Sequence, residues 1–168
     1  MRCVLPLALC AAAAIALSAC GFHPLYGTQG GVGASQLFAS IYVEPVPDRA
    51  GYELRNRLID LLDSSGSPAG ARYRLKIDLN EDRRGVALQN DASITRYNYL
   101  LTADYTLSDA SGTVVTHGHE STLTAYNVVA SPYATLMAAQ DAERRGADDL
   151  SERIRLDLGV FFARRNAK

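Results

Sequence analysis

The stretch RYRLKIDL, residues 72–79, alternates charged and apolar residues without interruption. The apolar positions are Tyr73, Leu75, Ile77 and Leu79. Because successive side chains of a β-strand point to opposite faces, this period predicts a strand with one buried face. Such a strand needs neighbouring strands and a covering layer, so the chain is restricted to folds built around a sheet.

A longer alternation lies in ITRYNYLLTADYTL, residues 94–107, and we expect residues 81–91 (EDRRGVALQND) to connect the two strands. One face carries Tyr97, Tyr99, Leu101, Ala103, Tyr105 and Leu107. The turn-forming sequence Asp109-Ala110-Ser111-Gly112 follows and predicts a hairpin. The returning segment, residues 113–129, is weakly amphipathic on both faces. It is expected to be an edge strand or a surface that a partner contacts.

Two further elements precede the first alternation. In LFASIYVEPV, residues 37–46, the residues Leu37, Ala39, Ile41 and Val43 share one parity. This pattern predicts a half-buried strand that Pro45 and Pro47 end. A helix is expected next, because Asp48 is a favourable N-cap and leucines recur at helical spacing until the breaker segment SSGSPAG, residues 64–70.

The last segment predicts a long helix that Ser131 caps and Pro132 opens. Its expected core stripe is Leu136, Ala139, Ala142, Gly146, Leu150, Ile154, Leu158 and Phe161. The stripe is small in its first half, so the helix should lie close to a neighbour near Ala142 and Gly146. The order strand, helix, three strands, helix predicts an α+β two-layer sandwich, with one mostly antiparallel four-stranded sheet and two helices packed on one face.

The N-terminus carries an export segment. Arg2 precedes a charge-free apolar run over residues 3–17, which is shorter than the roughly 20 residues of a membrane-spanning helix. Leu17-Ser18-Ala19-Cys20 resembles the lipobox of bacterial lipoproteins, in which the cysteine becomes the lipidated first residue. We therefore expect a removed signal peptide over residues 1–19 and lipid attachment at Cys20, against the alternative of an ordinary signal peptide with an incidental thiol.

The mature chain would then hold one lipidated anchor and tether, residues 20–36, and one domain, residues 37–168. Phe22, Leu25 and Tyr26 either lie at the lipid interface or pack on the domain. With Arg2 removed, 16 basic residues stand against 18 acidic ones, so the net charge is about −2. This balance argues against nucleic-acid binding and polybasic membrane attachment, which leaves the acyl chains to hold the protein on the membrane.

Strand parity places a mixed, basic-leaning set of side chains on the sheet face that the helices leave uncovered. The candidate contact residues for phosphates or acidic partner groups are Arg72, Arg74, Lys76 and Arg96, with Arg83 and Arg84 in the expected connection. The alternative is an ordinary solvated face, which amphipathic antiparallel sheets normally present.

Catalytic and metal chemistry find little support in the sequence. His117 and His119 share one strand face, but a zinc site needs three or four ligands and His23 lies at the anchor. There is no G-x-S-x-G nucleophile elbow and no phosphate-cradling glycine loop. We expect a protein that is not an enzyme and that has no cofactor.

Three stretches together resemble the LptE family of lipopolysaccharide-assembly lipoproteins, in its alphaproteobacterial form. They are CGFHPLYG at the anchor, the ITRYNY strand, and the run STLTAYNVVASPYATLMAAQDAERRGADDLSERIRLDL. The resemblance implies an outer-membrane lipoprotein at the periplasmic face. It implies that the protein plugs and helps assemble a large β-barrel translocon of the LptD type, binds lipopolysaccharide and assists its insertion at the outer leaflet.

A second hypothesis remains open beside this one. The chain could be a lipid-binding auxiliary lipoprotein of another cell-envelope transporter, with its cargo under the helices or on the open sheet face. Retained phospholipid without lipopolysaccharide binding would favour this alternative.

Overall fold

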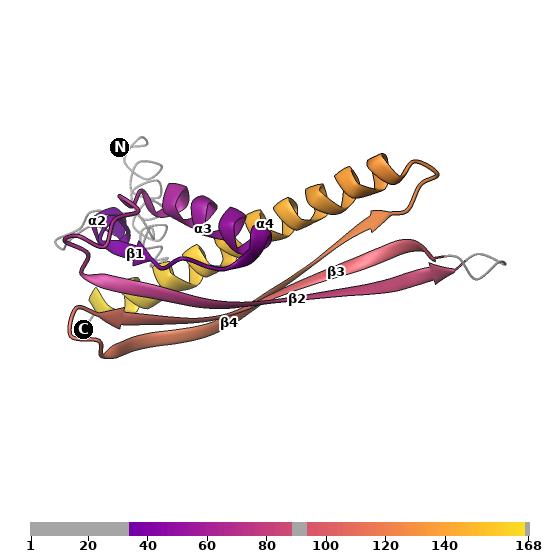
Figure 1. Ribbon diagram of the computed structural model, residues 1–168. Coiled ribbons are helices and arrows are strands. Elements are labelled where there is room, and N and C mark those ends of the chain that lie inside the picture. The colour runs from indigo at the N-terminus through magenta and orange to yellow at the C-terminus, as the bar shows by residue number, and fades with distance from the viewer. Residues whose placement is uncertain (1–33, 89–93, 167–168) are drawn as a thin grey trace, which may run out of the picture.

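The computed structural model describes residues 34–88 and 94–166. In this part of the chain four strands form one sheet in the order β1-β2-β3-β4, and helices cover one of its faces (Figure 1). The elements are α2 (Ala34–Ala39), β1 (Ile41–Val43), α3 (Asp48–Leu62), β2 (Tyr73–Leu88), β3 (Ile94–Asp109), β4 (Val114–Asn127) and α4 (Pro132–Asn166). Only β1 pairs in parallel, so the sheet is mostly antiparallel, as expected. With the helices on one face, the expected α+β sandwich is confirmed.

The long alternations form the centre of the sheet. Leu75 and Ile77 of β2 are buried, as are Tyr99, Leu101 and Leu107 of β3. The hairpin after β3 is also confirmed, with the Gly112 N–H donating to the Asp109 carbonyl at 3.0 Å and Gly112 at φ 84°. As expected, β4 is an edge strand.

The expected connection over residues 81–91 is wrong in its first part, because β2 continues to Leu88. Antiparallel pairing with β3 continues through this part, where Arg83 lies opposite Tyr99. The charged residues 81–84 interrupt the apolar alternation without interrupting the backbone ladder. The pairing therefore outweighs their weak preference for strands.

The first expected strand is wrong in its first half. Residues 34–39 form the short helix α2, and only residues 41–43 form a strand. The helix buries Leu37 and Phe38 side by side, and the Phe38 ring meets the Phe162 ring edge-on at 6.1 Å. Aromatic packing on the distant C-terminal helix therefore decides the local structure. The described fold begins at Ala34, inside the segment expected to be a tether.

Helix α3 ends as expected and begins differently. Its N-cap position is Pro47 and makes no side-chain capping bond, while Asp48 is the first helical residue, with φ at 63°. The prediction of Asp48 as N-cap is therefore wrong. Asp63 ends the helix in the left-handed conformation, and Leu54, Leu58 and Leu62 are buried.

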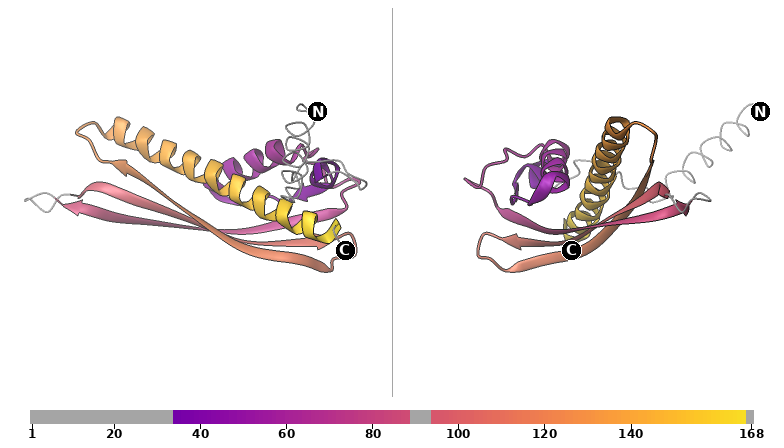
Figure 2. Two further views of the ribbon diagram at one scale, coloured as in Figure 1. Left: turned by 180° about the vertical axis from the view of Figure 1, so that it is seen from behind. Right: turned by 45° about the vertical axis from the view of Figure 1, so that its right-hand side comes forward.

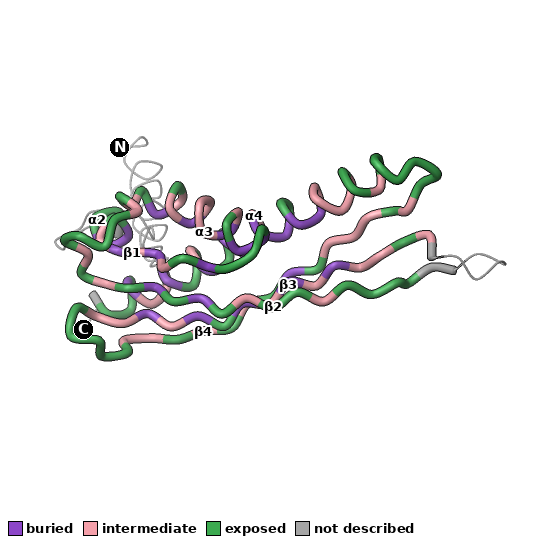
Figure 3. Tube along the Cα trace, viewed as in Figure 1, coloured by how far each residue is buried: buried purple, intermediate pink, exposed green. Residues whose placement is uncertain are grey.

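Helix α4 begins as expected, with Ser131 Oγ accepting a hydrogen bond from the Ala134 N–H at 3.3 Å. Its core stripe is confirmed in the middle, where Ala142, Leu150, Ile154 and Leu158 are fully buried. The stripe is wrong at both ends, because Leu136 is 52% exposed and the fully buried aromatic residue is Phe162 rather than Phe161. Figure 3 shows burial concentrated away from the first turns of α4.

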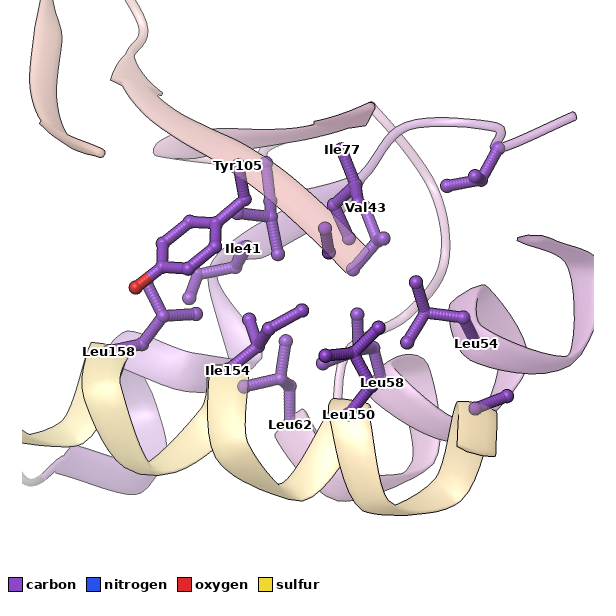
Figure 4. Close-up of a cluster of buried hydrophobic side chains, with 14 of the residues drawn as sticks. Ile41, Val43, Leu54, Leu58, Leu62, Ile77, Tyr105, Leu150, Ile154 and Leu158 are labelled. Atoms are coloured by element: carbon purple, nitrogen blue, oxygen red, sulfur yellow. The ribbon is translucent and has the colours of Figure 1, made fainter. Parts of the chain in front are cut away.

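The core lies between the sheet and the two long helices (Figure 4). Gly146 of α4 does approach the sheet, as expected. A Cβ placed there would nevertheless stand 3.7 Å from atoms of Leu101 and Tyr99, which is ordinary contact. The close approach therefore does not require a glycine.

Helix α4 extends well past α3, and this divides the sandwich into two parts (Figure 2). In the two-helix half, α3 lies beside α4, with Arg57 of α3 close to Asp148 and Glu152 of α4. In the one-helix half, α4 residues 132–142 have no helix beside them among the described residues. The boundary lies where Arg49, in the first turn of α3, meets Glu143, with their Nε and Oε2 atoms 3.9 Å apart.

Candidate interaction surfaces

The outer face of the sheet carries five of the six candidate basic residues. Arg72 directly precedes β2, Arg74, Lys76 and Arg84 lie on it, Arg96 lies on β3, and all five are exposed. The structure does not bring them together. Arg74 pairs with Ser108 of β3, and Arg96 is twelve positions from Ser108 along the same strand, or about 40 Å. They form two separate groups, one near β1 and one near the far end of the β2–β3 hairpin.

Two of these five charges have an acidic partner on their own strand. Lys76 Nζ lies 3.1 Å from Asp78 Oδ2, and Arg84 Nε donates to Asp82 Oδ2 at 2.7 Å. The hydrogen bond that Arg84 donates to Asp82, together with the negative charge of Asp82, raises the pKa of Arg84 above its ordinary value. The Arg74 guanidinium lies over the Tyr42 ring, 5.8 Å from its centroid. The outer face is consequently less basic than its arginine and lysine count indicates.

Arg83 faces the helices and not the outer surface. Its Nη2 donates to Glu143 Oε1 of α4 at 2.6 Å and lies 3.4 Å from Glu81 Oε2, and its guanidinium stands 5.3 Å from the Tyr99 ring centroid. Partial burial alone would lower the pKa of Arg83, but the Glu143 and Glu81 carboxylates raise it. The structure therefore separates Arg83 from the other candidates, because its ion pair with Glu143 joins β2 to α4.

A pocket of about 440 Å³ opens beside the Arg83–Glu143 ion pair, where α3 begins. It is lined by Asp48, Arg49, Glu81, Arg83, Leu136, Ala139, Gln140 and Glu143. Tyr99 lies beneath the Arg83 guanidinium, and its own burial, followed by the nearby Glu81 carboxylate, raises the pKa of its hydroxyl. Sequence reasoning missed this site because Arg83 and Glu143 are sixty residues apart. The parity that Arg83 shares with Leu75 and Ile77 was the available signal.

An uncharged strip runs along the outer face of β3 and β4. Cross-strand pairs in this strip join Asn98 to Ala125, Leu100 to Leu123 and Thr102 to Ser121. Leu123 is 60% exposed. This part of the face offers amide, hydroxyl and small apolar groups, which can pack against a polar surface without burying an unpaired charge.

The histidine pair lies beside this strip. His119 Nδ1 is 2.8 Å from Asp104 Oδ1 on the neighbouring strand, and both side chains are exposed. His117 is also exposed. Residues 34–88 and 94–166 contain no group of three or more histidine, cysteine, aspartate or glutamate residues placed to hold a metal ion.

Several expectations concern residues outside the described part of the chain. Cys20, the signal peptide over residues 1–19, and the choice between lipid contact and packing for Phe22, Leu25 and Tyr26 all lie there. Among the described helices, none combines the length and apolar character needed to cross a membrane.

Comparison with known proteins identifies the family. The sequence model of LptE, described as lipopolysaccharide-assembly, matches residues 38–158. A candidate lipoprotein of Caulobacter crescentus CB15 has a solved structure that is 33% identical, covers 77% of this chain and 96% of its own, and superposes with a TM-score of 0.67. An uncharacterized protein of Rickettsia prowazekii is 27% identical over 155 residues, which is 89% of this chain and 92% of that protein.

A more distant structure shares the fold alone. The rare lipoprotein B of Shewanella oneidensis is 8% identical, covers 75% of this chain and 96% of its own, and superposes with a TM-score of 0.56. The family match extends from α2 into α4 and includes the complete sheet. This chain therefore belongs to the LptE family of lipopolysaccharide-assembly lipoproteins.

Proposed function

We propose that this protein is an outer-membrane lipoprotein, anchored at the periplasmic face through acyl chains on Cys20, that plugs and helps assemble the β-barrel of the lipopolysaccharide translocon. It binds lipopolysaccharide and assists its insertion at the outer leaflet. The role is non-catalytic. The observation that carries the proposal is the family match over residues 38–158, which supports a general role in lipopolysaccharide assembly.

The geometry supports the plug part of the proposal. The interior of a large outer-membrane barrel is polar, so a plug needs extensive polar surface that carries few unpaired charges. The outer sheet face meets this need with the uncharged strip on β3 and β4 and the paired charges on β2. Strands β2, β3 and β4 run for 14 to 16 residues, or about 45 to 55 Å, which exceeds the thickness of a bilayer core.

Affinity purification from membranes tests the main proposal. A tagged full-length chain should recover one large outer-membrane barrel protein in stoichiometric amount from mild detergent, identified by mass spectrometry. Recovery of the tagged chain alone would overturn the plug assignment.

The lipid anchor has a separate test. Cys20→Ser should abolish incorporation of labelled palmitate and leave the protein soluble or with its signal peptide attached. Cys10→Ser, which changes a thiol inside the expected signal segment, is the matched control and should keep the label. Palmitate labelling of the Cys20→Ser variant would contradict the assignment.

The outer-face arginines are tested with purified lipopolysaccharide. Arg74→Glu combined with Arg96→Glu should weaken binding several-fold without unfolding, because both side chains are exposed. Arg144→Glu with Arg164→Glu makes the same change in net charge on α4 and serves as control. Unchanged lipopolysaccharide binding by the outer-face variant would mean that this face is an ordinary solvated surface. Purified protein that retains phospholipid but does not bind lipopolysaccharide would favour the alternative of a general lipid carrier.

A further inference from the structure

One continuous stripe of α4 changes its surroundings along the helix. The residues Tyr133, Leu136, Gln140, Glu143, Ala147, Ser151, Ile154 and Leu158 follow one another at spacings of three and four, so they share one face. From Ala147 onward these residues are fully buried, and Ser151 Oγ donates to the Leu54 carbonyl of α3 at 3.3 Å. Before Glu143 the stripe is open, with Tyr133 71% and Leu136 52% exposed.

The open part of the stripe forms one wall of a groove. The opposite wall is the helix-facing side of β2, where Glu81 and Arg83 line the same pocket as Leu136 and Gln140. The closed end is the first turn of α3, at Asp48 and Arg49. β1 pairs only with residues 73–75, so in the described part of the chain no strand covers the neighbouring edge of β2. Figure 1 shows that the first turns of α4 extend beyond α3. The groove therefore lies on the α4 stripe just past the start of α3.

We propose that this groove receives a short amphipathic helical segment of the partner polypeptide, which prolongs the α3 layer along α4. The identification of that polypeptide as the barrel rests on the proposed function. The open stripe from Tyr133 to Gln140 is about 10 Å long, which matches two helical turns. Helical geometry follows from continuity, because α3 packs on the same stripe as a helix.

The chemistry of the groove selects a polypeptide over a hydrocarbon chain. Six of its eight lining residues are charged or carry an amide, and covering them with acyl chains would remove water without replacing its hydrogen bonds. Apolar side chains of a helix would instead cover the exposed Tyr133 and Leu136. Its polar side chains would meet the charged wall.

Charge complementarity adds a requirement on the segment. Arg83 and Arg49 both approach Glu143. Asp48 has no ion-pair partner within residues 34–88 and 94–166, and Glu81 shares its only such partner, Arg83, with Glu143. The groove thus retains acidic groups with incomplete pairing, so the segment should carry a lysine or arginine on its polar side.

Site-specific photo-cross-linking tests the proposal. The photoreactive residue p-benzoylphenylalanine replaces Leu136, which lines the groove and is 52% exposed, in the tagged full-length chain, and the chain is irradiated in cells and purified with its barrel. We expect an adduct with the barrel, mapping to a segment that has apolar residues at helical spacing and a basic residue. The same probe at Leu156, which is 56% exposed on α4 in the two-helix half, should give no barrel adduct.

The outcomes separate the inference from the proposed function. If the unmodified tagged chain recovers no barrel, both fall. If it recovers the barrel but the probe at Leu136 labels only lipid, a second copy of the chain or nothing, the inference alone is overturned. Leu136→Asp should also lower barrel recovery at least several-fold while the circular dichroism spectrum and urea midpoint stay unchanged, whereas Leu156→Asp should not lower it.

Discussion

The two halves of α4 are held to the sheet in different ways. In the two-helix half, Leu150, Ile154 and Leu158 are fully buried between α3 and the strands. At the boundary and in the one-helix half, the attachment is mainly polar: Arg83 bonds to Glu143, and the Thr124 hydroxyl donates to the Ala142 carbonyl at 3.0 Å. Apolar burial stabilises regardless of orientation, whereas these polar contacts depend on geometry. The comparison indicates that apolar burial holds the two-helix half to the sheet, whereas the other half depends on polar contacts and keeps an exposed stripe.

The largest predicted effect belongs to the apolar half. Ile154→Ala should lower the free energy of unfolding by about 2 to 4 kcal/mol, because it removes fully buried methyl groups and leaves a cavity. Urea denaturation followed by circular dichroism measures this loss. Leu156→Ala, at an exposed position on the same helix, should change stability by less than about 0.5 kcal/mol. Similar losses for the two variants would contradict the burial of Ile154 between α3 and the sheet, on which the apolar attachment of the two-helix half rests.

The next effect compares two glycines. Gly118 of β4 lies opposite Tyr105, and a Cβ on Gly118 would fall on that ring, 2.7 Å from its Cε1 atom. Gly118→Ala should therefore cost about 1 to 3 kcal/mol through overpacking. The ring has little room to move, because its hydroxyl donates to Asp157 and the residue is buried.

Gly146→Ala should have the opposite sign. The nearest atoms to its Cβ would be 3.7 Å away, so the added methyl group makes ordinary contact inside a helix. A gain of about 0.5 to 1 kcal/mol is expected from the helix preference of alanine over glycine. Thermal unfolding of both variants provides the comparison, and destabilisation by Gly146→Ala would show that the contact with the sheet is tighter than the structure indicates.

The sheet could be predicted from the sequence because its period persists through long segments. Residues 72–79 and 94–107 alternate through their whole length, so their faces were assigned correctly. The i,i+2 ion pairs Lys76–Asp78 and Arg84–Asp82 could also have been recognised, since both members share one strand face. Their effect is to neutralise part of the outer face that the cation count made basic.

The remaining features depend on residues far apart in the chain. The alternation Leu37, Ala39, Ile41, Val43 fits a strand, but its first half is a helix that packs Phe38 on the distant Phe162. Arg83 can point toward the helices because the Glu143 carboxylate of α4 pairs with it there. Likewise, the exposed start of the α4 stripe follows from where α3 begins, which no periodicity within α4 encodes.

The third effect concerns the polar half. Glu143→Gln removes the carboxylate charge that Arg83 and Arg49 approach, and should cost about 1 to 2 kcal/mol because the pair is only partly buried. Hydrogen exchange should show faster local opening of α4 residues 132–142 and little change in α3. Glu152→Gln, at an exposed pair with Arg57, is the control and should have almost no effect. Uniform loss of protection across both halves would contradict the comparison.

The smallest effect lies near the boundary between the halves and depends on pH. The buried Thr122 hydroxyl donates to the Asp149 carboxylate of α4, and this bond, with a further one from Arg153, lowers the pKa of Asp149 below its ordinary value of 3.8. A carboxyl whose pKa is lower in the folded state stabilises the fold above its unfolded pKa, and this contribution is lost as the pH falls through the folded value.

Thr122→Val should therefore cost about 0.5 to 1 kcal/mol near pH 7. The difference from the wild type should shrink below about pH 4, as Asp149 becomes protonated and its preference for the hydroxyl donor weakens. Urea denaturation at a series of pH values measures this change. In an Asp149→Asn background the same substitution should show no such pH dependence. A difference that stays constant from pH 7 to pH 3 in the wild-type background would mean that Thr122 stabilises the helix contact through packing, without a charge-dependent bond to α4.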